Sequence, residues 1–122
     1  MNSNFTKNLK PHVEAELALA SRARVEDRPD VEFSHLENAH VIGQKSTRWH
    51  VKLHCLMLLW AVRQRNFREL FGQLPRIAGA ATKTAFGWVP NGNTGGANVS
   101  PFKSMPIKAE HAEIIEKARN GG

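Results

Sequence analysis

A short connection between two stretches of helical pattern, at residues 43 to 46, most constrains how this chain can fold. Before it, apolar residues recur at helical spacing after Pro29, which suits the first turn of a helix. After it, the most apolar segment of the chain, RWHVKLHCLMLLWAVRQ, can start from a cap at Ser46 or Thr47. Gly43 is a natural helix terminus. Because so few residues join the two helices, we expect them to pack as antiparallel neighbours.

Four of the six histidines lie in this hairpin. In such a hairpin, residues whose numbers sum to roughly 90 lie at the same height, because both helices rise equally per residue. His40 is therefore level with His50, and Glu37 is level with His54. All four lie on the apolar stripe of their helix, so we expect them to face the space between the helices. His35 falls off its stripe and is expected to face solvent.

A carboxylate or an imidazole buried between helices costs several kcal/mol unless it is paired or bound to a metal. Glu16, on a preceding helix, also lies in an apolar stripe at about the height of Glu37 and His40. Spacings of three and four residues put Glu37 with His40, and His50 with His54, on one side of each helix, where they can share an ion. We predict Glu37, His40, His50 and His54 as metal ligands, and Glu16 as a further ligand or an acceptor for an imidazole N–H.

Nitrogen and oxygen ligands favour one Zn, Fe, Co or Ni ion over Ca or Mg. Two carboxylates are fewer than the four of a ferritin-like di-iron site, so we expect one ion and not two. A buried network of histidines and glutamates would satisfy the same groups without a metal. The protein would then be a helical interaction module that docks a protein partner on its basic face. Both interpretations stay open, as does a homo-oligomer. The absence of a diagnostic catalytic motif favours binding over an enzyme.

The rest of the chain predicts an all-α fold. A helix is expected over residues 5 to 25, and a fourth should start at Asn66, with Glu69 at its N3 position, and kink at Pro75. From Gly87 the sequence is dense in glycine and proline, which excludes a regular helix or strand. We predict one domain, 1–122: an antiparallel bundle of about four helices (1–86), an ordered irregular strap (87–108) anchored by Trp88 and Phe102, and a short helix (109–119).

Charge and hydropathy bear on partners and location. The net charge of +6 is spread along the chain, and no aromatic-interleaved basic motif accompanies it, so we predict no nucleic-acid binding. The longest apolar run, LMLLWAV, falls well short of the roughly 20 residues that cross a bilayer, and the N-terminus lacks a signal-peptide core. The lone Cys55 agrees with a reducing compartment. We expect a cytoplasmic protein that is not inserted in a membrane.

Several blocks occur in order along nearly the whole chain: HLENAHVIGQ, HVKLHCLMLLW, GQLPRIAGA and GNTGGANVSPFKSMPI. This order resembles a family of short bacterial proteins catalogued only as a domain of unknown function. The family often has tryptophan where Cys55 stands, which argues against a general role for the thiol. The resemblance implies no activity. Members are often encoded beside metal-efflux transporters and metal-responsive regulators, which implies a heavy-metal context.

Overall fold

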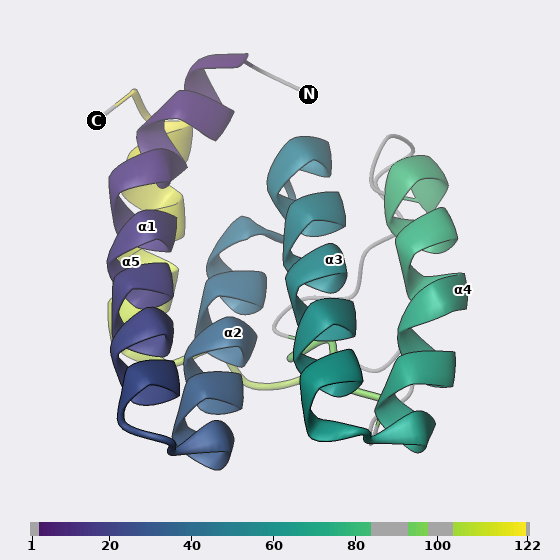
Figure 1. Cartoon of the computed structure of the whole chain (residues 1–122). Helices are drawn as coiled ribbons and strands as arrows, with labels where there is room; N and C mark the ends of the chain where they lie inside the picture. Colours follow the sequence, from purple (N-terminus) through teal and green to yellow (C-terminus); the bar gives the residue numbers. More distant parts are fainter. Residues whose placement is uncertain (1–2, 84–92, 98–103, 122) are drawn as a thin grey trace.

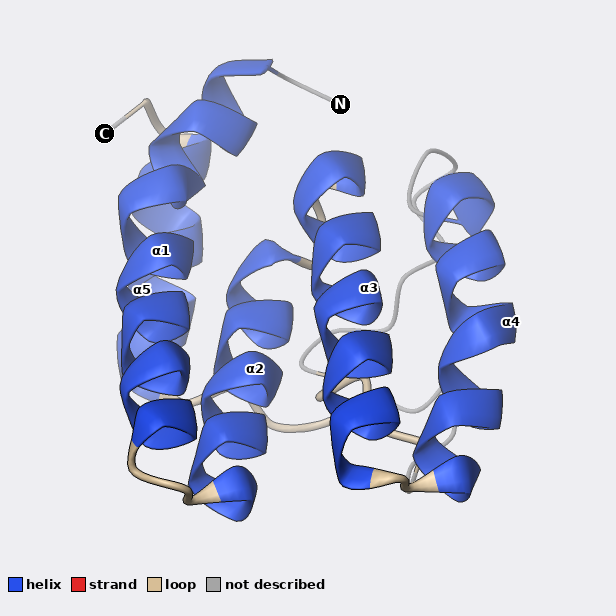
Figure 2. Cartoon of the chain, in the orientation of Figure 1, coloured by secondary structure: helices blue, strands red, loops and turns tan. Residues whose placement is uncertain are grey.

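The computed structural model describes residues 3–83, 93–97 and 104–121, and within them it contains five α-helices and no strands. The first four stand side by side in alternating directions, and the fifth lies beside the first and also contacts the second (Figure 1; Figure 2). This arrangement is the predicted antiparallel bundle. The helices are α1 (Ser3–Val25), α2 (Pro29–Gly43), α3 (Thr47–Gln64), α4 (Phe67–Lys83) and α5 (Ala109–Arg119).

Local sequence signals account for most helix ends. Pro29 opens α2, as predicted, because a helix's first turn does not need the missing N–H. Ser46 is the N-cap of α3, although its side chain makes no cap hydrogen bond and is instead 2.8 Å from the Thr6 hydroxyl. At the start of α4 the Asn66 Oδ1 accepts a hydrogen bond of 3.0 Å from the Glu69 N–H, so the predicted N-cap and N3 positions are confirmed. The helix continues through Pro75.

The α2–α3 turn is tight because Gly43 has no side chain. A Cβ atom at Gly43 would lie 2.8 Å from the Cβ of Trp49, so any larger residue would push the two helices apart. The Trp49 indole in turn donates a hydrogen bond of 3.0 Å to the Thr6 carbonyl of α1. The hairpin predicted from the short connection is therefore also fixed against α1. Leu9, Val13, Leu53 and Met57 fill the core between these helices.

Helix α4 buries polar as well as apolar residues. Glu69 and Gln73 are buried, with 7% and 0% of their surface exposed, beside Leu70, which packs against the core. Three other apolar residues, Phe67, Phe71 and Leu74, are 64%, 65% and 51% exposed. A helix on the edge of a bundle normally turns its apolar stripe to the core. The polar face of α4 must therefore find hydrogen-bond partners inside the protein, and these partners define the site described below.

The segment 93–97 packs between α2 and α4. A Cβ atom at Gly95 would lie 2.6 Å from the His40 ring, and one at Gly72 would lie 2.4 Å from the Cβ of Ala97. The predicted anchors Trp88 and Phe102 lie outside the described residues, so an ordered strap over the whole of 87–108 stays a prediction. Residues 104–108 pass behind α3 and α2 to reach α5, which has the bounds predicted for it (Figure 1). Among the helices described, none combines the length and apolar character that crossing a bilayer requires.

Candidate metal centre

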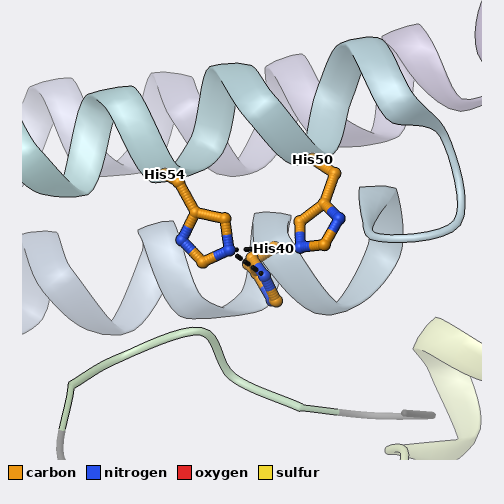
Figure 3. Close-up of side chains that lie close together, drawn as sticks. All are labelled: His40, His50 and His54. Carbon is orange, nitrogen blue, oxygen red and sulfur yellow. Dashed lines mark hydrogen bonds between the residues drawn. The ribbon is translucent and has the colours of Figure 1, made fainter. Parts of the chain in front are cut away.

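Three imidazoles from two helices converge in the interior. His40 comes from α2, and His50 and His54 come from successive turns of α3 (Figure 3). Their exposed fractions are 2%, 7% and 3%. The Nε2 of His54 lies 3.1 Å from the Nε2 of His40 and 3.1 Å from the Nε2 of His50. One ligand nitrogen from each histidine falls within 4.8 Å of the other two. The structure therefore brings together three of the five residues predicted as ligands.

Two of these imidazoles have a fixed orientation because their Nδ1 atoms face carbonyl oxygens. The Nδ1 of His40 lies 2.7 Å from the main-chain oxygen of Asn93, and the Nδ1 of His54 lies 2.6 Å from the Oε1 of Gln73. A carbonyl oxygen can only accept, so each Nδ1 carries the proton and donates it. A neutral imidazole with its proton on Nδ1 has a lone pair on Nε2. Both lone pairs therefore point into the cluster.

The side-chain amide of Gln73 can point only one way. Its Nε2 lies 2.5 Å from the Oε2 of Glu69 and 2.9 Å from the Gly95 carbonyl oxygen. Both of these atoms are acceptors, so they must face the amide NH₂ group. The opposite atom, Oε1, is then the one that faces His54. The proton position on His54 is thus a consequence of how Gln73 is held.

Burial keeps all three imidazoles neutral at pH 7. Loss of solvation, reinforced by the neighbouring imidazoles, lowers the pKa of His40 well below its ordinary value. Burial is also the main reason that the pKa of His50 falls to about 3. It lowers the pKa of His54 to about 4, although the hydrogen bond to Gln73 acts in the opposite direction. The contact between the Nε2 atoms of His40 and His54 therefore has no proton to share.

The two predicted carboxylate ligands lie apart from this cluster of ligand atoms. Glu37 is near it, because its carboxyl group accepts a hydrogen bond from Thr94, in the segment that covers His40. Burial raises the pKa of Glu37, against the effect of that hydrogen bond. Glu16 accepts a hydrogen bond of 2.8 Å from His35 Nδ1. The expectation that His35 faces solvent was wrong, because this imidazole is only 23% exposed and pairs with Glu16.

Four residues that hold the imidazoles in place were not predicted from the sequence: Glu69, Gln73, Asn93 and Gly95. Two of them, Glu69 and Gln73, are four apart on α4, and this spacing on a helix with an apolar opposite face is typical of a solvent face. Gly95 has a φ of 87°, which suits glycine, and it lies directly against the His40 ring. A glycine in a turn-rich segment gives no sign of such a contact. Their roles follow only from the packing of α4 and the segment 93–97 against the imidazoles.

The geometry matches what a first-row transition metal needs. Zinc–nitrogen bonds are about 2.0–2.1 Å long, so the nitrogens of a tetrahedral site lie about 3.3 Å apart. The two Nε2 separations of 3.1 Å are close to this value. Metal-bound histidines also commonly donate their other N–H to a carbonyl or carboxylate oxygen, as His40 and His54 do here. Two of the three nitrogen separations therefore suit a shared ion, and the third lies within 4.8 Å.

The fold and the cluster define a small α-helical bundle protein with a buried three-histidine centre. The chain belongs to the family described as Protein of unknown function (DUF3703), whose sequence model matches residues 7–115. The resemblance to a domain of unknown function is thereby confirmed. No curated protein and no solved structure matches the chain.

Proposed function

We propose that this protein binds one divalent transition metal ion through the Nε2 atoms of His40, His50 and His54. The observation that carries the proposal is the contact of 3.1 Å between the Nε2 atoms of His40 and His54, both of which carry their proton on Nδ1. Two lone pairs at this distance repel each other unless a cation lies between them. A metal ion removes the repulsion and uses both lone pairs.

A purely structural hydrogen-bonded network explains the short contacts between these Nε2 atoms less well. His50 could donate from its Nε2 to the lone pair of His54, which would satisfy that contact of 3.1 Å. It would still leave the Nε2 lone pair of His40 facing the Nε2 atom of His54, with no proton between the two atoms. A proton added to either imidazole would be opposed by burial, which lowers both of their pKa values. The metal interpretation needs no charged imidazole.

The donor set narrows the class of ion. Three neutral imidazoles suit Zn, Co, Ni or Fe(II) and not Ca or Mg, which need oxygen ligands. Glu37 lies one helical turn before His40, and we retain it as the carboxylate donor for a further coordination position. We leave Glu16 out of the ligand set, because its carboxylate is hydrogen bonded to His35. A cytoplasmic role in a bacterial response to heavy metals is the biological context that we propose for the ion.

Calorimetry and thermal melting test the proposal directly. Protein purified without a polyhistidine tag would be titrated with Zn, Co and Ni, beside the double variant His50→Ala/His54→Ala and the control His12→Ala, whose imidazole is exposed. A ligand that binds only the folded state stabilises it by about 2.7 kcal/mol at a concentration of 100 times Kd. We expect this stabilisation to raise the Tm of wild type and of His12→Ala. The Tm of the double variant should not change. A wild type indifferent to all three ions would refute the proposal.

Docking of a protein partner is a second candidate function, favoured by the outer face of α4. Phe67, Phe71 and Leu74 are more than half exposed and follow one stripe of that helix. Arg65 and Arg68 are exposed near its start. An amphipathic helix with acidic flanks would complement both features. Such a peptide should bind wild type and lose its affinity for Phe71→Ser; a wild type that does not bind it would remove this candidate.

A further inference from the structure

We infer that Glu69 is a positioning residue that fixes the tautomer of His54, and so decides whether this imidazole can act as a metal ligand. The consequence for metal binding rests on the proposed function. The tautomer itself is a property of the protein without metal and can be measured separately. The effect of Glu69 passes through its hydrogen-bond partners Gln73 and Ala97.

The direct path runs through Gln73. The Glu69 Oε2 accepts a hydrogen bond from the Gln73 Nε2 at 2.5 Å, and the side chains of both residues are buried. Both oxygens of the Glu69 carboxylate accept hydrogen bonds from N–H groups, so the carboxylate holds the NH₂ group of Gln73 toward itself. The Oε1 of Gln73 is then left to accept from His54 Nδ1, at 2.6 Å. The remaining proton-free nitrogen of His54 faces the cluster.

A second path runs through the segment 93–97. The main-chain N–H of Ala97 donates to both carboxylate oxygens of Glu69, at 3.1 and 3.0 Å. The same segment supplies the Gly95 carbonyl, which accepts from Gln73, and the Asn93 carbonyl, which accepts from His40. One buried carboxylate therefore supports two of the three imidazoles. The close approach of Ala97 to Gly72 brings the segment within reach of α4.

Glu69 is itself held rigidly, which lets it impose this polarity on its neighbours. Its main-chain N–H is bound by the Asn66 cap at 3.0 Å, so its backbone position at the start of α4 is fixed. Replacing the carboxylate by an amide would put an NH₂ group where only acceptors now stand. The Gln73 amide could then reverse, giving up its hydrogen bond to the Gly95 carbonyl, and donate to His54 Nδ1. His54 would have to move its proton to Nε2, which would point an N–H into the cluster and remove one ligand lone pair.

The test compares Glu69→Gln with Glu32→Gln. Glu32 is a matched control because it is also a buried glutamate, 5% exposed, and it pairs with Arg63 away from the cluster. Nitrogen-15 NMR of the metal-free proteins would report which nitrogen of His54 carries the proton. Zn affinity would be measured by competition with a chelating indicator. We expect His54 to be protonated on Nδ1 in wild type and Glu32→Gln, and on Nε2 in Glu69→Gln, with Zn affinity 10- to 100-fold weaker in Glu69→Gln alone.

The double variant Glu69→Gln/Gln73→Glu is the rescue. It exchanges the amide and the carboxylate, so that residue 73 again offers only acceptors to His54 Nδ1. We expect it to restore the Nδ1 proton but only part of the Zn affinity, because the Gly95 carbonyl then faces an acceptor in place of the Gln73 NH₂ group. A Glu69→Gln protein that keeps the wild-type tautomer would overturn the inference. If that variant does not fold, a double variant with its His54 proton on Nε2 would overturn it instead. If wild type binds no metal but the tautomer changes as expected, the proposed function fails and the role of Glu69 stands.

Discussion

The Nε2 atoms of His40 and His54 lie 3.1 Å apart across the contact between α2 and α3, and the Nδ1 atom of each ring faces a carbonyl oxygen. The oxygen that faces His40 belongs to the segment 93–97, and the one that faces His54 belongs to α4. The two rings are thus oriented by parts of the chain that follow them by 53 and 19 residues. This arrangement directs two lone pairs to one point, and it makes the stability of the protein, and the metal affinity that we propose, depend on proton positions.

Stability without metal should fall as the pH drops from about 6.5. In the unfolded chain each histidine has its ordinary pKa near 6.5, whereas burial lowers the pKa of His50 to about 3 and of His54 to about 4 in the folded protein. Between these values the unfolded state binds more protons, so the free energy of unfolding rises with pH by about 1.4 kcal/mol per pH unit for each histidine. Urea unfolding from pH 8 to pH 4 measures this slope. His50→Ala/His54→Ala should show a smaller slope, and equal slopes would contradict the prediction.

Metal binding should persist to a lower pH than ordinary histidines allow. Protons compete with a metal only where they bind the free ligands, and ordinary imidazoles would lose the ion near pH 6.5. The lowered pKa values of His50 and His54 move that competition toward pH 4. We expect Zn affinity to change less than tenfold between about pH 7 and pH 5.5, a window in which ordinary imidazoles would lose far more. Competition titrations at each pH, with circular dichroism to confirm folding, decide between lowered and ordinary histidine pKa values.

Alanine at Gly95 should loosen the segment over the site. Its left-handed φ of 87° disfavours any residue with a side chain, by about 1–2 kcal/mol, and the added Cβ would lie 2.6 Å from the His40 ring. We expect Gly95→Ala to lose about 2 kcal/mol or more of stability and to weaken Zn binding. Gly121→Ala is the control, because Gly121 has a φ of 90° but no atom near its Cβ position. Similar effects in the two variants would mean that the contact with His40 contributes nothing to stability or to Zn binding.

Removing Arg63 should destabilise the bundle through Glu32. The carboxylate of Glu32 is buried on α2 and pairs with the Arg63 guanidinium of α3. A buried charge that loses its partner typically costs about 3 kcal/mol, so Arg63→Ala should approach this value. The double variant Arg63→Ala/Glu32→Ala should lose less than the two single variants added together. As a surface control, Lys117→Ala removes an exposed pair and should cost under about 1 kcal/mol. Urea unfolding gives the free energies of unfolding of the two single variants, the double variant and Lys117→Ala. Strict additivity of the Arg63 and Glu32 effects would contradict the prediction.

The helices and the histidine hairpin followed from the sequence because local interactions determine them. Apolar spacing, the proline at position 29 and the cap at Asn66 act within one or two helical turns, so they can be identified without knowing the rest of the fold. The short link after Gly43 forces antiparallel helices, and equal rise then sets His40 level with His50. Convergence of the three histidines needed nothing further, since all lay on apolar stripes.

The roles of the acidic residues depended on how α1 and α4 are rotated. Height and the apolar stripe placed Glu16 near Glu37 and His40, but its partner depends on how α1 packs on α2, and it pairs with His35. On α4, Glu69 and Gln73 are buried while Phe67 and Phe71 are exposed. Hydrogen bonds to His54 and to the segment 93–97 satisfy the polar groups inside the protein, and these partners lie outside the helix's own sequence.

By itself the sequence determined that the chain forms an antiparallel helical bundle and that three histidines share one buried space, because helix spacing and a short turn are properties of neighbouring residues. Only the tertiary structure decided which nitrogens face that space. Asn93 and Gln73 lie far along the chain from the rings that they orient, and hydrogen-bond polarity becomes fixed only when donors and acceptors from separate elements meet. The proton-free nitrogens of His40 and His54 are therefore a product of packing.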